Sequence, residues 1–125
     1  GGKSNSANDE TFANNLCDLT KATTVVFSIG RKKFANPNPV AVGTIRKKIK
    51  NVRIACTQLS KHCANTLPVT RATHLHHFFS LGKSTNECCS GTFVIELGDR
   101  IEYLPEMASH TEFIVRSAPT SLCLR

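Results

Sequence analysis

The stretch CCSGTFVIELGDRIEYL, residues 88–104, joins two adjacent cysteines to two runs of alternating apolar residues that meet at a Gly-Asp step. If residues 97–99 form a three-residue hairpin loop, an ion pair lies across one face and apolar pairs lie across the other. Gly98 and Asp99 both tolerate the positive φ that such a turn requires. The stretch therefore predicts an antiparallel β-hairpin. Its expected cross-strand pairs are Glu96 with Arg100, Ile95 with Ile101 and Phe93 with Tyr103.

Outside this hairpin, short runs rich in Val, Ile, Thr and Phe recur between turn signals, and no stretch has the pattern of a long amphipathic helix. The two prolines of NPNP (36–39) indicate a loop, and so does the polar stretch 60–68. We therefore expect an all-β fold, a jelly roll or β-sandwich of about seven or eight short antiparallel strands. The other expected strands are 23–29, 40–45 and 52–59 around a basic turn, 69–81, and 111–117 with Phe113 and Val115 inward, or Ile114 in the other phase.

The length and composition predict a single domain. A chain of 125 residues that is 40% hydrophobic buries enough surface for one core. The opening residues 1–11 are polar and rich in Gly, Ser and Asn, which is typical of a flexible tail or a cloning remnant. We expect one β domain over residues 12–125, and no apolar run is long enough to cross a membrane.

The chain has six cysteines, an even number that is typical of an oxidised, secreted protein. No CxxC pair is present, so the usual zinc-ribbon and thioredoxin patterns are missing. We expect a disulfide-stabilised extracellular domain in which Cys17 pairs with Cys123, and Cys56 or Cys63 pairs with the adjacent Cys88 and Cys89, although the sequence permits other pairings.

The formal net charge is +7, with the basic residues concentrated in GRKKF (30–34) and IRKKIK (45–50). This charge favours partners with acidic surfaces, such as heparan-type glycans or an acidic cell-surface receptor. Solvated basic turns are the alternative interpretation. No aromatic residue is interleaved with these cations, so a nucleic-acid partner is not expected. The candidate contact residues are Arg46, Lys47, Lys48 and Lys50.

Residues 85–117 resemble the C-terminal third of the tumour necrosis factor ligands and the related C1q-type domains. The matching positions are Gly91, Phe93, Ile95, Leu97, Gly98, Asp99 and Ile101, with Phe113 at the start of the closing strand. The resemblance implies a jelly-roll homotrimer: a secreted, cytokine-like ligand that binds and clusters a receptor. In this interpretation Gly91, Phe93, Gly98, Asp99 and Phe113 are structural. The chain departs from the family in having no Trp, one Tyr and no closing Phe-Gly.

Candidate catalytic groups are sparse. His74 and His76 would point to the same side of a strand, as two zinc ligands do, but no third ligand is identifiable. His62 beside Cys63 suggests a nucleophile only if that thiol is unpaired. We therefore expect no enzyme and no cofactor. The alternatives to a cytokine-like ligand are a small secreted, disulfide-bonded effector or toxin that binds host-surface glycans or proteins, and a zinc hydrolase that uses His74 and His76.

Overall fold

The computed structural model describes residues 6–30, 35–64, 66, 72–95 and 105–124. This part of the chain contains three helices and a two-stranded parallel sheet, so the fold is mixed α/β. The prediction of an all-β jelly roll with seven or eight antiparallel strands is wrong. The elements are α1 (Ser6–Thr20), β1 (Thr24–Phe27), α2 (Pro39–Lys48), β2 (Arg53–Cys56) and α3 (Pro105–Ser117).

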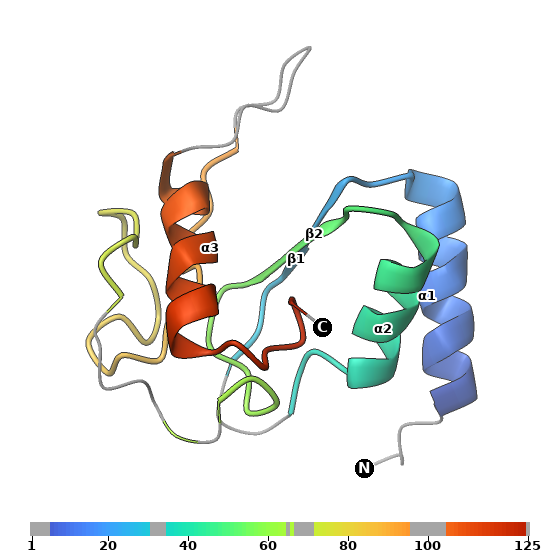
Figure 1. Cartoon of the computed structure of the whole chain (residues 1–125), viewed down its shortest axis with the longest axis horizontal. Coiled ribbons are helices and arrows are strands. Elements are labelled where there is room, and N and C mark those ends of the chain that lie inside the picture. The colour runs from blue at the N-terminus through green and yellow to red at the C-terminus, as the bar shows by residue number, and fades with distance from the viewer. Residues whose placement is uncertain (1–5, 31–34, 65, 67–71, 96–104, 125) are drawn as a thin grey trace.

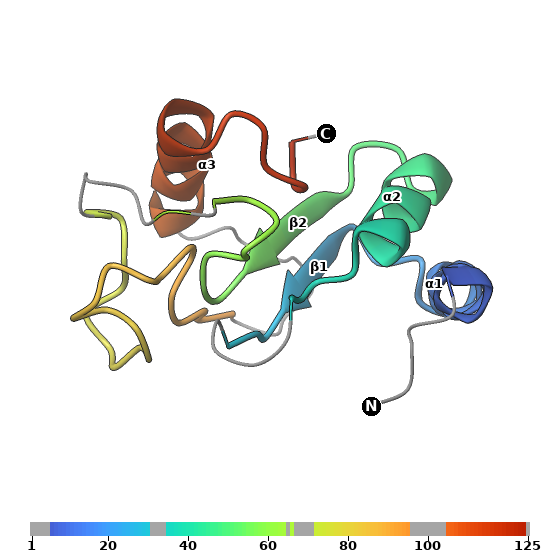
Figure 2. The ribbon, with the colours of Figure 1, turned by 90° about the horizontal axis from the view of Figure 1, so that it is seen from below.

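The two strands pair in parallel, with Thr24 beside Arg53 at one end and Phe27 beside Cys56 at the other. A parallel pair needs a crossover between its strands, and α2 lies in that crossover. The sheet lies between α3 on one side and the pair α1 and α2 on the other (Figures 1 and 2). The expected strands 23–29 and 52–59 thus contain β1 and β2, whereas the antiparallel arrangement is wrong.

Helix α2 occupies residues 40–45, which were expected to form a strand, and the basic run that was expected to form a turn is its last turn. Asn38 accepts a hydrogen bond from the Val40 amide at 2.8 Å, and Pro39 follows at the first helical position. An Asn cap followed by proline is a strong start signal, and it outweighs the β-branched residues that follow. Val42 and Ile45, three residues apart, point into the core.

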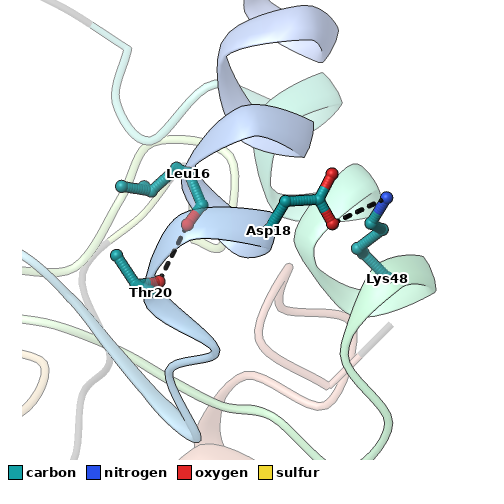
Figure 3. A network of polar contacts seen from close by, with 4 residues as sticks. All are labelled: Leu16, Asp18, Thr20 and Lys48. Carbon is teal, nitrogen blue, oxygen red and sulfur yellow. Dashed lines mark hydrogen bonds and ion pairs between the residues drawn. The ribbon is translucent and has the colours of Figure 1, made fainter.

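Helices α1 and α2 run side by side in the same direction. At their N-terminal ends the Asn38 amide donates to Asp9 Oδ2 at 2.7 Å, and at their C-terminal ends Lys48 Nζ lies 3.0 Å from Asp18 Oδ1 (Figure 3). Helix α1 ends where Lys21 adopts a left-handed conformation and its amide donates to Cys17 O. The helix includes residues 6–11 of the expected tail.

Replacing Asn38 by alanine is expected to lower the free energy of unfolding by about 1 kcal/mol, the usual cost of losing an N-cap. The variant Asn38→Ser keeps an acceptor oxygen and is expected to lose less. The control Asn15→Ala changes an exposed residue of α1 and is expected to be neutral or slightly stabilising. Urea denaturation measures all three, and equal stability of Asn38→Ala and the parent chain would contradict the assigned cap.

Helix α3 includes residues 111–117, which were expected to form a strand. Phe113 and Ile114 are both buried, whereas Val115 is 56% exposed. In a strand, Phe113 and Val115 would share a face, but a helix places both 113 and 114 on the same side as the buried His110. The strand prediction fails because β-branched and aromatic residues also occupy buried helix faces.

Between β2 and α3, the described residues form turns and one isolated bridge, Gln58 with Cys88. Residues 87–90 run beside the end of β2 through backbone hydrogen bonds: Leu59 to Glu87, Cys89 to Thr57 and Ser90 to Cys56. The expected strand 69–81 is wrong over 72–81. Residues 92–95 of the expected hairpin are not in a strand, and the rest of it, with Gly98 and Asp99, lies outside the described residues.

Two apolar clusters form the core. The first lies between the sheet and the helices α1 and α2, and the second lies between the end of β2 and α3. Cys123 packs against both clusters, and Arg46 anchors it by donating from Nη1 to Cys123 O at 2.6 Å. The buried members are Ala13, Cys17, Val42, Ile45, Val52 and Ile54 in the first cluster and Cys56, Leu59, Cys89, Phe113 and Ile114 in the second.

All six cysteines are free thiols, so the predicted disulfides are wrong. The even number of cysteines suggested an oxidised framework, but four of the thiols are buried in helical and apolar surroundings, where cysteine packs as a small hydrophobic residue. None of the helices in the described part of the chain is long and apolar enough to span a membrane.

Candidate functional site

Three cysteines from separate segments, Cys56, Cys89 and Cys123, meet at the second apolar cluster, and the charge of a fourth, Cys63, acts on the first two. Cys56 is the last residue of β2, and Cys89 lies beside that strand. Cys63 lies in a turn in which its backbone N–H donates a hydrogen bond to Ser60 O. Cys123 follows α3. The charges of Cys63 and Cys123 help to raise the pKa of both Cys56 and Cys89, and the charge of Cys56 also helps to raise that of Cys89. We call these four residues the thiol cluster. Cys17 and Cys88 do not belong to it.

A buried histidine pair borders the thiol cluster. His110 Nε2, on α3, lies 3.2 Å from Cys89 Sγ, and His74 Nε2 lies 2.7 Å from Cys89 O. The two imidazole rings are 5.4 Å apart, and the His74 ring also stacks against Phe113. Both histidines are buried. Cys89 is therefore in contact with one imidazole at its sulfur and another at its carbonyl.

Burial raises the pKa of two cluster thiols, Cys56 and Cys89, and keeps them protonated. It raises the pKa of Cys56 to about 12, with smaller contributions from Cys63 and Cys123. Burial also raises the pKa of Cys89 well above its ordinary value, helped by the other three thiols and opposed by a hydrogen bond from the Cys56 backbone. A nucleophilic cysteine needs a thiolate at neutral pH. Cys56 and Cys89 lack that property.

The histidines are held neutral by the same burial. Burial, with smaller contributions from the nearby His74 and Arg53, lowers the pKa of His110 to about 3. Burial also lowers the pKa of His74, against a raising effect of its bond to Cys89. Cys89 and His110 thus form a neutral thiol–imidazole contact rather than the thiolate–imidazolium pair of cysteine hydrolases.

Two hollows flank His110. One, of about 160 Å³, has Arg53, His110, Thr111 and Cys123 among its lining residues. The other, of about 20 Å³, is lined partly by His76, Ser90 and His110. The buried Ser90 hydroxyl has no hydrogen-bond partner within the described part of the chain. The smaller hollow has room for one water molecule, which would satisfy this hydroxyl.

The histidines expected to bind zinc together do not do so. His74 binds the Cys89 carbonyl, whereas His76 stacks against His77 and Phe78, with ring centroids 4.2 and 4.4 Å away. Among the residues that the structure describes, no group of three or more His, Cys, Asp or Glu side chains could hold a metal ion.

The predicted basic contact residues lie where α1 and α2 end together. Lys47, Lys48 and Lys50 are exposed, and so is Lys21, which follows α1 directly. Arg46 is half-buried because its guanidinium binds the Cys123 and Leu124 carbonyls. We call the four lysines the basic end.

Three of the residues that were expected to be structural lie within the described part of the chain. Gly91 donates its amide to Thr57 O, Phe93 lines the smaller hollow, and Phe113 lies in the second apolar cluster. Gly91 has φ +68°, and a Cβ there would lie 3.0 Å from Leu75 Cδ2, so any other residue would be strained. The sequence interpretation missed His110. Its spacing to Phe113 and Ile114 is helical, and this was the available signal.

Comparison with known proteins identifies no relative: no family model, curated protein or solved structure matches this chain. Function is therefore inferred from the geometry of the structure. The basic end and the thiol cluster lie on different parts of the molecule, since the first caps the α1 and α2 pair and the second lies between β2 and α3 (Figure 1).

Proposed function

We propose that this protein is a binding module, without chemistry of its own, that recognises a sulfated, heparan-type glycan through the basic end. The observation that supports this proposal is the grouping of four exposed lysines at the neighbouring ends of α1 and α2. Extracellular action accompanies the proposal, because such glycans are found at cell surfaces. The trimeric cytokine model depended on a jelly roll, so only its binding component is retained.

Helix stabilisation accounts for part of the basic end but not for all of it. Cations in the last turn of a helix interact favourably with its dipole. Arg46 also holds the C-terminal segment, and Lys48 pairs with Asp18. The ammonium groups of Lys47 and Lys50, however, make no ion pair or hydrogen bond with any described residue. They are available to sulfate or carboxylate groups of a partner.

The whole-chain charge supports the same partner class. A net charge of +7 gives a positive potential that attracts polyanions within about a Debye length of the surface. A lysine ammonium makes a point-charge contact and not a planar, bidentate one. The basic end is therefore suited to a flexible chain of repeated anionic groups, in which several weak contacts add together.

The test is heparin binding by the double variant Lys47→Glu/Lys50→Glu, with Lys61→Glu/Arg116→Glu as the matched control. Both variants change the net charge equally, but the control residues are exposed elsewhere. Because each surface contact contributes about 1 kcal/mol, we expect the first variant to bind roughly 10- to 100-fold more weakly at low salt. The control should lose much less.

Equal losses in the two variants would show that net charge alone governs binding and would overturn the proposal. Stronger binding to poly-glutamate than to heparin would also overturn it, in favour of an acidic protein partner. Raising the salt concentration should weaken the specific binding and reduce the difference between the variants, because exposed charges are screened.

A further inference from the structure

We propose that the protein binds one unbranched fatty acid, with the alkyl chain in an apolar hollow between α1, β1 and α2 and the carboxylate at the lysines beside it. The hollow has a volume of about 230 Å³. This inference goes beyond glycan binding by the basic end, because it adds a second ligand and a cavity. Among the residues that line the hollow are Leu16 and Cys17 of α1, Val25 and Val26 of β1, and Ile45 of α2.

The chemistry of the hollow is apolar. Cys17 and Ile45 on its inner side belong to the first apolar cluster, whereas Leu16 and Val26 are each 37% exposed and leave it open to solvent. None of the described residues that line it carries a charge. The Thr20 hydroxyl donates to Leu16 O at 2.8 Å within the helix (Figure 3). A hydrocarbon therefore suits this space better than a polar ligand does.

The volume of the hollow sets the size of the ligand. An apolar cavity of about 150 Å³ accepts benzene, so roughly eight to ten carbon atoms fit in this one. Sites for larger, drug-sized molecules begin at about 300 Å³. The space is therefore suited to a single alkyl chain of about ten carbons.

Exposed apolar side chains extend the hollow along α1. Phe12 is 67% exposed and Leu19 is 85% exposed. With Leu16 they recur at spacings of four and three residues, which places all three on one side of the helix. Exposed apolar side chains that adjoin one another mark ligand-binding grooves or interfaces. These residues would cover the part of an alkyl chain that lies outside the hollow.

Two lysines of the basic end directly follow residues that line the hollow. Lys21 follows Thr20, and Lys50 follows Ile49. Both lysines are exposed. An apolar hollow with cations beside it is complementary to an alkyl chain that ends in an anion. A neutral hydrocarbon would leave the two ammonium groups without a role in binding.

A free fatty acid fits this site better than a membrane surface does. Three elements enclose the hollow, so it receives an inserted chain, whereas a site that enters a bilayer must protrude. Asp18 is also exposed at this end and pairs with Lys48 (Figure 3). It reduces the attraction of this end for an extended anionic surface, but it leaves Lys21 and Lys50 for a single carboxylate.

The first test is calorimetric titration of the whole chain with decanoate, below the concentration at which it forms micelles. We expect one decanoate per chain. Octanoate should bind roughly 10- to 20-fold more weakly, because each buried methylene changes the binding constant by about fourfold. Decanol, which lacks the charge, should bind up to about fivefold more weakly than decanoate. No saturable binding, or equal affinity for decanoate and octanoate, would overturn the proposal.

The second test fills the hollow with Ala22→Phe, and its matched control is Ala108→Phe. Ala22 lines the hollow, whereas Ala108 is exposed on α3. The first variant should bind decanoate at least ~10-fold more weakly, since its ring displaces two or more methylenes worth about fourfold each. The control should bind decanoate as the parent chain does. Equal decanoate affinities of the two variants would contradict the site.

A charge variant decides the question if Ala22→Phe fails to fold. Lys21→Gln/Lys50→Gln should abolish the preference for decanoate over decanol, and Lys61→Gln/Arg116→Gln should keep it. A preference unchanged in the first variant would disprove the role of these lysines.

Two further measurements separate this proposal from its alternatives. Ala22→Phe should leave heparin binding unchanged, so loss of the fatty acid site and loss of the glycan site are distinguishable. Binding to vesicles of phosphatidylserine and phosphatidylcholine without binding of free decanoate would overturn the proposal, in favour of a membrane surface.

Discussion

Acidification from pH 6.5 to pH 3 is expected to destabilise the fold strongly, with His110 as the main cause. Folding buries this imidazole in its neutral form and lowers its pKa from 6.5 to about 3. Between these two values the unfolded chain binds a proton that the folded chain does not. The free energy of unfolding therefore decreases as the pH falls through this window, and it is unaffected by His110 above it.

The expected loss is large compared with the stability of a small domain. One pKa unit corresponds to about 1.4 kcal/mol, so the shift of His110 corresponds to roughly 4–5 kcal/mol. Domains of this size are stable by only about 5–15 kcal/mol in total. His74 acts in the same direction, because its pKa is also lowered by burial.

Urea denaturation at several pH values measures this effect. His110→Gln is expected to be less stable than the parent chain at pH 7 but to lose much less stability on acidification. His77→Gln, at an exposed position, should follow the parent chain throughout. Stability that falls as steeply in His110→Gln as in the parent chain would disprove the role of His110.

Ile114→Ala is expected to lower the free energy of unfolding by about 2–5 kcal/mol, whereas Val115→Ala should change it by no more than about 0.5 kcal/mol. Ile114 is 2% exposed and packs in the second apolar cluster, whereas Val115 is 56% exposed on the outer side of α3. Truncating Ile114 leaves a cavity in the core, whereas truncating Val115 leaves only a smaller exposed side chain.

This pair also tests the conformation of residues 111–117. A strand with Phe113 and Val115 inward would make Val115 the sensitive position and Ile114 the tolerant one. Urea denaturation of the two variants distinguishes the helix from that strand. The opposite order of effects, or equal effects, would contradict α3 as described.

The sequence predicted some elements correctly for a clear physical reason. The run 23–29 is dense in β-branched residues and ends at Gly30, and it contains β1. The alternation through Val52, Ile54 and Cys56 likewise predicted β2. Both strands place apolar side chains against a core, and the local sequence pattern is enough to predict such a strand. The parallel pairing of the two strands depends on the helix between them, which was not predicted.

The helical segments were missed because their start signals were outweighed by β-branched residues. Pro39 and Pro105 each stand at the first position of a helix, α2 and α3, and Asn38 caps the former. The prolines were interpreted only as evidence against a central strand, although proline is also favoured at the first position of a helix. Reading residues 40–45 and 111–117 with a helical period would have placed Val42 with Ile45, and His110 with Phe113.

The thiol cluster could be predicted only in part. The sequence shows six cysteines, but the spacing between residues 56, 63, 89 and 123 does not show which of them meet. Their convergence depends on the backbone bonds from residues 87–90 to the end of β2 and on the return of the chain after α3. The basic end was visible as a charge run, but its position beside Lys21 required the packing of α1 on α2.

The segment 118–124 has a consequence for how this chain folds during synthesis. Leu122 packs against the first apolar cluster, Cys123 packs against both, and Ser121 is fully enclosed. On the ribosome, α1, β1, α2 and β2 emerge long before these residues. The core of the nascent protein therefore remains incomplete, and side chains that are buried in the folded chain remain exposed, until Arg46 binds the Cys123 carbonyl, 77 positions further along the chain.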